Sequence, residues 1–182
     1  MKPTSLIITG QTIDLPTLSD AQYTYYEELA EKINHIYTEA GEDRVIIGLS
    51  GPAGAGKSVL TAMLTHIFSE KENLFQYVNL GLDAFHYTND ELDEKELHGV
   101  KGRHDTYNIE LLTEKLDAFN KGEDVLLPEY SRETHNPVSN IAQVTELKAL
   151  ILLEGQWLLR NTPRWEEARN LCSYQFSLTG PE

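Results

Sequence analysis

The chain has 182 residues, of which 40% are hydrophobic and 24% are charged. This length suits one domain, and the composition is that of a globular protein. The formal net charge of −14 argues against sequence-independent binding to nucleic acid or to an anionic membrane, because both need a surplus of Lys and Arg at the contact. The single cysteine, Cys172, cannot form an internal disulfide, and the N-terminus lacks an apolar run of signal-peptide or membrane-span length. The sequence therefore predicts a cytoplasmic protein with no nucleic-acid or membrane partner.

The N-terminal 43 residues are expected to form an extension with one helix. Two short apolar runs within residues 1–18 flank a glycine and predict a small hairpin or an edge strand. Ser19 and Gln22 then match the capping-box pattern, and apolar residues recur after them at helical spacing. Gly41 is expected to end this helix. The extension thus covers residues 1–43 and precedes the core.

From residue 44 onward, strand-like apolar runs alternate with helix-like segments. The expected strands are 44–50, 75–83, 124–130, 149–155 and 172–179. Helices are expected at 57–71, from near Asn108, and within 156–171, where Pro163 interrupts or restarts the helix. The acidic run at 89–96 is expected to be an exposed loop or helix. This alternation predicts a parallel sheet covered on both faces, with 44–182 as the core of a single domain spanning 1–182.

A glycine-rich stretch, GPAGAGKS at residues 51–58, lies between a predicted strand and a predicted helix. It fits the P-loop pattern G-x-x-x-x-G-K-[ST], in which backbone N–H groups and a helix N-terminus surround phosphate oxygens. Lys57 would reach the β and γ phosphates of ATP, and Ser58 would coordinate Mg²⁺. The predicted fold is therefore α/β, a three-layer P-loop NTPase fold with an N-terminal helical extension. The predicted nucleotide-binding residues are Gly51, Ala53, Gly54, Ala55, Gly56, Lys57, Ser58 and Val59.

P-loops occur in several classes of protein, and other motifs must distinguish between them. The chain has no Asn-Lys-x-Asp guanine-reading motif and no LSGGQ-like transporter signature. A small-molecule kinase remains, which needs a base for the acceptor hydroxyl and a carboxylate on the metal side. Asp83, at the end of the strand after the P-loop helix, is the expected base, and capping of a turn is its alternative role. Glu154 ends an apolar strand and is expected to help hold Mg²⁺, as a Walker B acid does.

Five stretches, GPAGAGKS, LDAFHY, KGRHDTYNIELL, VLLPEYSRETHNPV and LILLEGQWLL, follow one another in this order. Together they resemble the phosphoribulokinase/uridine kinase family of P-loop kinases over about residues 44 to 160. The likeness is greatest to a bacterial branch described as uridine kinase-like or fructose-transport-system-kinase-like. That branch has P-D-T-F-D-like and E-D-P-V-like stretches, where this chain has HDTYN and HNPV.

The resemblance implies ATP- and Mg²⁺-dependent phosphorylation of a hydroxyl on a small metabolite, such as a nucleoside, a sugar or a pantothenate-like alcohol. Asp83 matches the catalytic base of the family, Lys57 its P-loop lysine and Glu154 its strand-end acid. The positions that match the acceptor pocket are Phe85, His86, Arg103, His104, Tyr130, Arg132 and His135. From residue chemistry alone, the KGRH and YSRETH clusters either hold an anionic group or form surface ion pairs in solvated loops.

The family resemblance also implies a helix and an arginine-bearing lid after the strand at 172–179, which the sequence up to residue 182 does not contain. Two other functions therefore stay open beside the kinase. One is a nucleotide-binding regulatory or interaction module, and the other is a slow NTPase without transfer to a metabolite. A homodimer is one option for the assembled state.

Overall fold

The computed structural model describes residues 1–8, 11–15, 18–71 and 74–179. At its centre are four parallel strands in the order β4 (Gln76–Gly81), β7 (Ala149–Gly155), β3 (Arg44–Ser50) and β8 (Tyr174–Ser177). β3 is buried along its whole length, and β7 along all of it except Glu154. These two strands are central and covered on both faces, which is why their sequences are continuous apolar runs. The predicted parallel sheet is confirmed.

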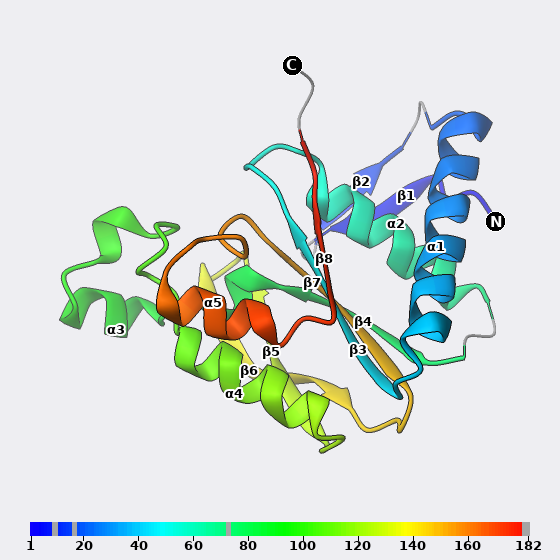
Figure 1. Cartoon of the computed structure of the whole chain (residues 1–182). Helices are drawn as coiled ribbons and strands as arrows, with labels where there is room; N and C mark the ends of the chain where they lie inside the picture. The colour runs from blue at the N-terminus through cyan, green and yellow to red at the C-terminus, as the bar shows by residue number, and fades with distance from the viewer. Residues whose placement is uncertain (9–10, 16–17, 72–73, 180–182) are drawn as a thin grey trace.

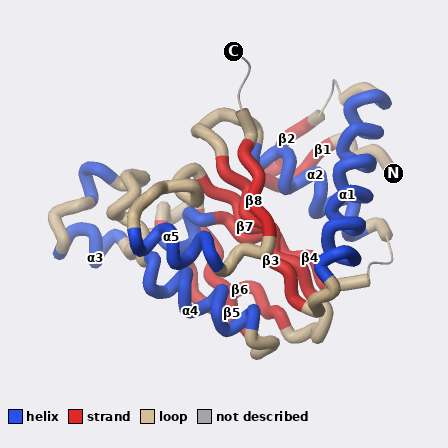
Figure 2. The backbone as a smooth tube through the Cα atoms, in the orientation of Figure 1, coloured by secondary structure: helices blue, strands red, loops and turns tan. Residues whose placement is uncertain are grey.

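Helices cover both faces of this sheet, which gives the predicted three layers (Figure 1). On one face, α1 (Asp20–Ala40) and α2 (Lys57–Ser69) pack against alternate residues of the two central strands. On the other face, α4 (Ile109–Asn120) and α5 (Pro163–Asn170) pack against the residues in between. Figure 2 shows the strands lying between these two groups of helices. No helix within the described residues is long and apolar enough to cross a membrane.

The N-terminal extension follows the sequence pattern closely. Ser19 and Gln22 form the predicted capping box, with Ser19 Oγ accepting from the Gln22 N–H at 3.2 Å and Gln22 Oε1 accepting from the Ser19 N–H at 2.9 Å. Gly41 ends α1 in the left-handed conformation, at φ 66°. The predicted hairpin is also present, as β1 (Ser5–Ile8) paired antiparallel with β2 (Gln11–Asp14). The glycine expected between the two runs lies outside the described residues.

The strand predicted at 124–130 forms as β5 (Val125–Ser131), but it does not join the parallel sheet. It pairs antiparallel with β6 (Asn136–Val144), a strand that sequence analysis did not predict. Pro128 explains the difference, because proline has no N–H to donate and is excluded from a central strand. The pairing register shifts between Leu127 and Glu129, on either side of this proline.

Two predicted element boundaries were wrong. β4 ends at Gly81, so Asp83 lies in a short 3₁₀ helix, η1 (Leu82–Phe85), rather than at the end of the strand. Residues 156–162 are turn and loop, and α5 starts at Pro163, where the missing N–H of proline costs nothing in the first helical turn. The acidic run contains a short helix, α3 (Asn89–Glu94), and a further 3₁₀ turn, η2 (His98–Val100), follows it.

Gly155 is the point at which β7 and η1 come closest. A Cβ at this position would lie 2.5 Å from Leu82 Cβ, a distance that forces one of the two segments to move. Gly155→Ala is therefore expected to lower the free energy of unfolding by about 1–3 kcal/mol, as measured by urea denaturation.

Gly99→Ala provides the matched control, because a Cβ at Gly99 would meet no atom within 4 Å. This variant is expected to change the free energy of unfolding by less than about 0.5 kcal/mol. Equal losses in the two variants would show that the contact with Leu82 is not the cause.

Candidate active site

The P-loop joins the C-terminal end of β3 to the N-terminal end of α2, as its pattern predicts. Gly54 and Gly56 have φ values of 79° and 85°, which a residue with a side chain adopts only with strain. Lys57 is the first residue of α2, so the loop ends at the positive end of a helix whose first N–H groups have no partner within the helix. This arrangement suits the binding of phosphate oxygens.

The Lys57 ammonium group lies within the loop itself. Its Nζ donates to the carbonyl oxygens of Gly51 at 2.8 Å and of Pro52 at 2.9 Å. Gly51 also lies close to the C-terminal segment, because a Cβ there would come within 2.9 Å of the Leu178 carbonyl oxygen. The loop therefore has a fixed course between α2 and the strand at the sheet edge.

Glu154 lies beside the P-loop because β7 is parallel to β3 and pairs Glu154 with Leu49. Ser58 Oγ donates to Glu154 Oε1 at 3.3 Å, while Oε2 is buried and has no hydrogen-bond partner. Burial raises the pKa of the Glu154 carboxyl, an effect that the Ser58 hydroxyl and the Lys57 charge oppose. A buried carboxylate oxygen without a partner, next to a hydroxyl, is a suitable pair of hard oxygen ligands for Mg²⁺.

Mg²⁺ in nucleotide sites is usually held by one or two protein oxygens, with water and phosphate oxygens completing its coordination. The described residues contain no group of three or more His, Cys, Asp and Glu side chains placed to hold a metal ion. Ser58 and Glu154 fit this sparse type of site, and they would hold the ion at the β and γ phosphates.

Asp83 is the second residue of η1, two residues after the end of β4, and its side chain is 63% exposed. Tyr107 donates from its hydroxyl to Asp83 Oδ1 at 3.2 Å, and His86 Nε2 lies 3.7 Å from the same oxygen. Burial together with the Asp83 charge raises the pKa of Tyr107, so the phenol stays a donor. Asp83 is thus an accessible carboxylate whose orientation is set by a buried tyrosine.

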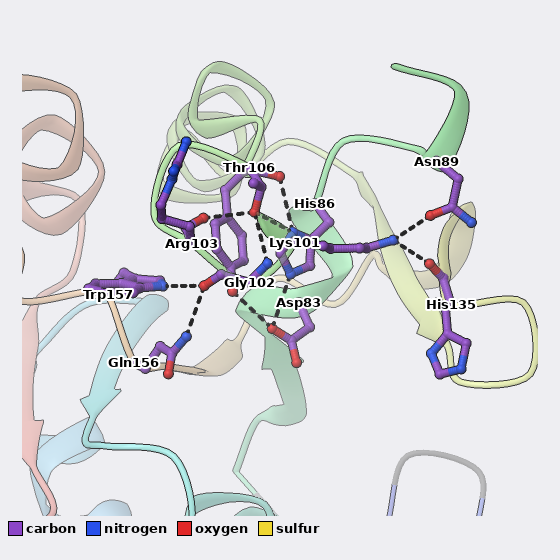
Figure 3. A network of polar contacts seen from close by, with 11 residues as sticks. Asp83, His86, Asn89, Lys101, Gly102, Arg103, Thr106, His135, Gln156 and Trp157 are labelled. Atoms are coloured by element: carbon purple, nitrogen blue, oxygen red, sulfur yellow. Dashed lines mark hydrogen bonds and ion pairs between the residues drawn. The ribbon is translucent and has the colours of Figure 1, made fainter. Parts of the chain in front are cut away.

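His86 supports this arrangement from the buried side (Figure 3). Its ring stacks on Tyr107, with centroids 3.9 Å apart and an interplanar angle of 24°, and its Nδ1 lies 3.0 Å from the Thr106 carbonyl oxygen. Burial lowers the pKa of His86 and so favours the neutral ring. Because a carbonyl can only accept, the ring carries a proton on Nδ1. The Asp83 charge, 3.7 Å from Nε2, raises the pKa of His86 and so opposes the effect of burial.

Lys101 connects three segments at the side of this group (Figure 3). Its Nζ donates to Asn89 Oδ1 at 2.7 Å and to the His135 carbonyl oxygen, and it lies 5.6 Å from the ring centroid of Tyr130. Burial lowers the pKa of Lys101, whereas the Asp83 charge raises it. Lys101 therefore ties α3 and the turn between β5 and β6 to the loop after η2.

These groups line one cavity of about 1120 Å³. Several elements contribute to its walls, namely the P-loop, β4, η1, the loop after η2, β5, β6 and the end of β7. The cavity thus contains the P-loop, the Glu154 carboxyl and the exposed Asp83 carboxylate together. The residues predicted from sequence that line it are Ala53, Gly54, Lys57, Ser58, Asp83, His86, Tyr130, Arg132 and Glu154.

Four residues predicted for the acceptor pocket do not line this cavity. Phe85 is fully buried in the core between η1 and α4, and Arg103 pairs with Asp105, its Nε donating to Oδ1 at 2.6 Å. His104 packs edge-to-face on Trp157 with ring centroids 5.7 Å apart, and His135 contributes its carbonyl to Lys101.

Sequence reasoning missed other groups of this site, above all Tyr107 and Lys101. Tyr107 lies in HDTYN, one of the two stretches that depart from the related bacterial branch, and Lys101 begins the KGRH cluster. Gln156 was also missed, although it directly follows Glu154 and Gly155. Tyr107 and Lys101 each lie in a stretch that the sequence had already singled out, HDTYN and KGRH. The orientation of their side chains, however, depends on the packed structure.

The parallel sheet and the P-loop define a P-loop protein of the α/β class. Residues 46–163, more than half of the chain, match the family model described as "Phosphoribulokinase / Uridine kinase family". The chain belongs to the phosphoribulokinase/uridine kinase family, as the resemblance predicted.

Individual relatives agree with this assignment. "Uncharacterized protein YggC" from Escherichia coli is 28% identical over 97% of this chain and 73% of its own length. A pantothenate kinase from Streptococcus gordonii is 31% identical over 73% of this chain and 43% of its own length. A solved structure from Silicibacter, titled "putative fructose transport system kinase", has a TM-score of 0.67 and 26% identity, and the match covers 76% of this chain and 66% of that one.

The raised pKa of Glu154 has a consequence for stability. A carboxyl whose pKa is higher in the folded than in the unfolded state destabilises the fold as pH rises from the unfolded pKa through the folded one. Glu154→Gln removes this ionisation. The free energy of unfolding of the variant minus that of the wild type is therefore expected to increase as pH rises from about 4.5 to neutral.

Urea denaturation at a series of pH values measures this effect without nucleotide. Glu146→Gln is the matched control, because Glu146 is exposed and lies outside the cavity. A pH-independent difference between Glu154→Gln and the wild type would contradict the assigned buried ionisation.

Proposed function

We propose that this chain is an ATP- and Mg²⁺-dependent kinase that transfers the γ-phosphoryl group to a hydroxyl of a small metabolite. The observation that carries the proposal is the presence of Lys57, Glu154 and Asp83 on the walls of a single cavity. Phosphoryl transfer needs these three functions, namely a phosphate cradle, a metal-side ligand and an oriented base.

In the proposed reaction the acceptor oxygen attacks the γ-phosphorus in line, and the bond from that phosphorus to the leaving oxygen of ADP breaks. The hydroxyl proton passes to Asp83. Tyr107 holds the receiving carboxylate by its hydrogen bond, and burial keeps that tyrosine protonated. Mg²⁺, when bound, neutralises charge on the phosphates, and Ser58 and Glu154 would hold it there.

Cationic groups supply the remaining support for this proposal. Lys57 lies at the start of α2, while Arg132 and Lys101 line the same cavity on the side of Asp83 and Tyr130. The chain as a whole is strongly acidic, so these local cations determine whether a phosphate is attracted to the site. We assign Lys57 to the nucleotide and Arg132 with Lys101 to the acceptor or the transferred group.

The relatives guide the choice of acceptors. Their names include "Putative uridine kinase", "Pantothenate kinase" and, for one solved structure, "D-glycerate 3-kinase". A panel of nucleosides, sugars, pantothenate-like alcohols and glycerate with ATP and Mg²⁺ is expected to show at least one compound that accelerates ADP formation. The phosphorylated product identified by mass spectrometry would confirm transfer, and EDTA is expected to abolish it.

ADP formation that no panel compound accelerates, with free phosphate as the product, would favour the slow NTPase instead. Nucleotide binding without ADP formation under any of these conditions would favour the regulatory module.

Asp83→Asn is expected to lower kcat by about 10²–10⁴-fold, because the amide cannot take the hydroxyl proton. Binding of a non-hydrolysable ATP analogue, measured by calorimetry, should change little, since Asp83 lies on η1 and not on the P-loop. Asp90→Asn, on an exposed position of α3 outside the cavity, is the matched control. A wild-type kcat in Asp83→Asn would refute its role as the base.

A further inference from the structure

Part of the cavity wall comes from the N-terminal hairpin. Ile7 of β1 and Gln11 of β2 line the same cavity as the P-loop and Asp83. Both residues precede residue 46, where the match to the family model begins. This wall is therefore an addition to the part of the chain that the family model describes.

The hairpin is attached to the helix that carries the P-loop. Leu6 is 5% exposed and packs in a cluster with Ala62 and Met63 of α2, and His66 Nε2 of the same helix lies 2.7 Å from the Met1 carbonyl oxygen. The Leu15 N–H also donates to the Thr4 carbonyl oxygen at 2.8 Å, which extends the pairing of the two strands. The position of the hairpin is thus set relative to α2, whose first residue is Lys57.

The alternation of a strand explains which side chain faces the cavity. Successive residues of β1 point to opposite sides, so Leu6 turns toward α2 while Ile7 turns away from it. Ile7 is 73% exposed, and this large apolar side chain lies at the wall of the cavity. Gln11 pairs with Ile8, so its side chain lies on the face of Leu6, opposite to that of Ile7.

The cavity reaches from the proposed site of transfer to this wall. Its lining runs from Lys57 and Asp83, where transfer is proposed, to the exposed edge of β4 at Val78 and Asn79 and to the hairpin. Under the proposed function, its volume of about 1120 Å³ holds the nucleotide phosphates at the P-loop together with the acceptor.

We propose that the β1–β2 hairpin is a specificity element for the acceptor, with Ile7 covering an apolar part of the acceptor. The inference rests on the proposed function, because it takes Asp83 as the point at which the acceptor hydroxyl lies. It adds the chemical class of the acceptor, an alcohol that extends away from its reactive hydroxyl through an apolar segment. Since the hairpin is fixed to α2, it positions this far end relative to the γ-phosphate.

The test compares Ile7→Ser with Ile13→Ser, a control on the opposite face of the same hairpin, because Ile13 pairs with Leu6. Ile13 is also exposed, at 41%, and does not line the cavity. Thermal unfolding first establishes that both variants remain folded. Binding of each panel compound is then measured by calorimetry with Mg²⁺ and a non-hydrolysable ATP analogue, and KM and kcat are measured for each compound that is phosphorylated.

Ile7→Ser is expected to weaken binding of the acceptor, and to raise its KM, by about tenfold. The affinity for the ATP analogue and kcat are expected to stay within about twofold, and Ile13→Ser should match the wild type. The acceptors most affected should be those with the longest apolar segment.

The outcomes separate the two proposals. An acceptor that is phosphorylated with the same KM by the wild type and Ile7→Ser would overturn the hairpin proposal and leave the kinase in place. A compound that binds the wild type but is not phosphorylated, and that binds Ile7→Ser about tenfold more weakly, would support the hairpin and overturn the kinase. Binding of no panel compound to the wild type would overturn both.

Discussion

The parallel pairing of β3 with β7 is the constraint on which the rest of the site depends. The two strands pair residue by residue from Arg44 with Ala149 to Ser50 with Gly155, so they end at the same level of the sheet. The P-loop leaves from one strand end and Glu154 lies at the other. Hydrogen bonds between main-chain groups therefore bring Glu154 to the P-loop, although about 100 residues of sequence separate them.

The pairing of β7 with β4 positions Asp83 at the same end of the sheet. β4 lies on the outer side of β7, with Gly81 opposite Glu154, and the chain turns immediately into η1. Gly155 permits this turn because it presents no side chain to Leu82. Asp83 follows one residue later and meets Tyr107, which arrives from the segment before α4. The cavity is thus built at the end of the sheet where the parallel strands terminate, the usual ligand position in folds of this kind.

The elements that sequence analysis predicted correctly are those whose signals are local. The capping box at Ser19, the buried runs of β3 and β7, and the glycines of the P-loop each specify their own conformation. The partners of a strand are not specified locally, and this is why β5 was assigned to the wrong sheet and β6 was missed. Pro128 carried the one local signal that could have prevented the error.

The site itself was predictable in part, for the same reason. The roles of Lys57, Ser58, Glu154 and Asp83 were assigned from motif and position, and the structure brings these residues to one cavity. Tyr107 was not identified, because its contact with Asp83 arises only when η1 and the start of α4 pack together. Phe85 shows the reverse case, in which a residue next to a site residue turns entirely into the core.

The contacts of Lys57 with its own loop have a consequence for phosphate affinity. Its ammonium group already has two carbonyl partners, at Gly51 and Pro52. A phosphate that recruits this lysine must replace those two bonds, so the observed affinity is the difference between two sets of hydrogen bonds rather than the sum of new ones. These two bonds also hold the charged side chain against the backbone that surrounds the proposed phosphate site.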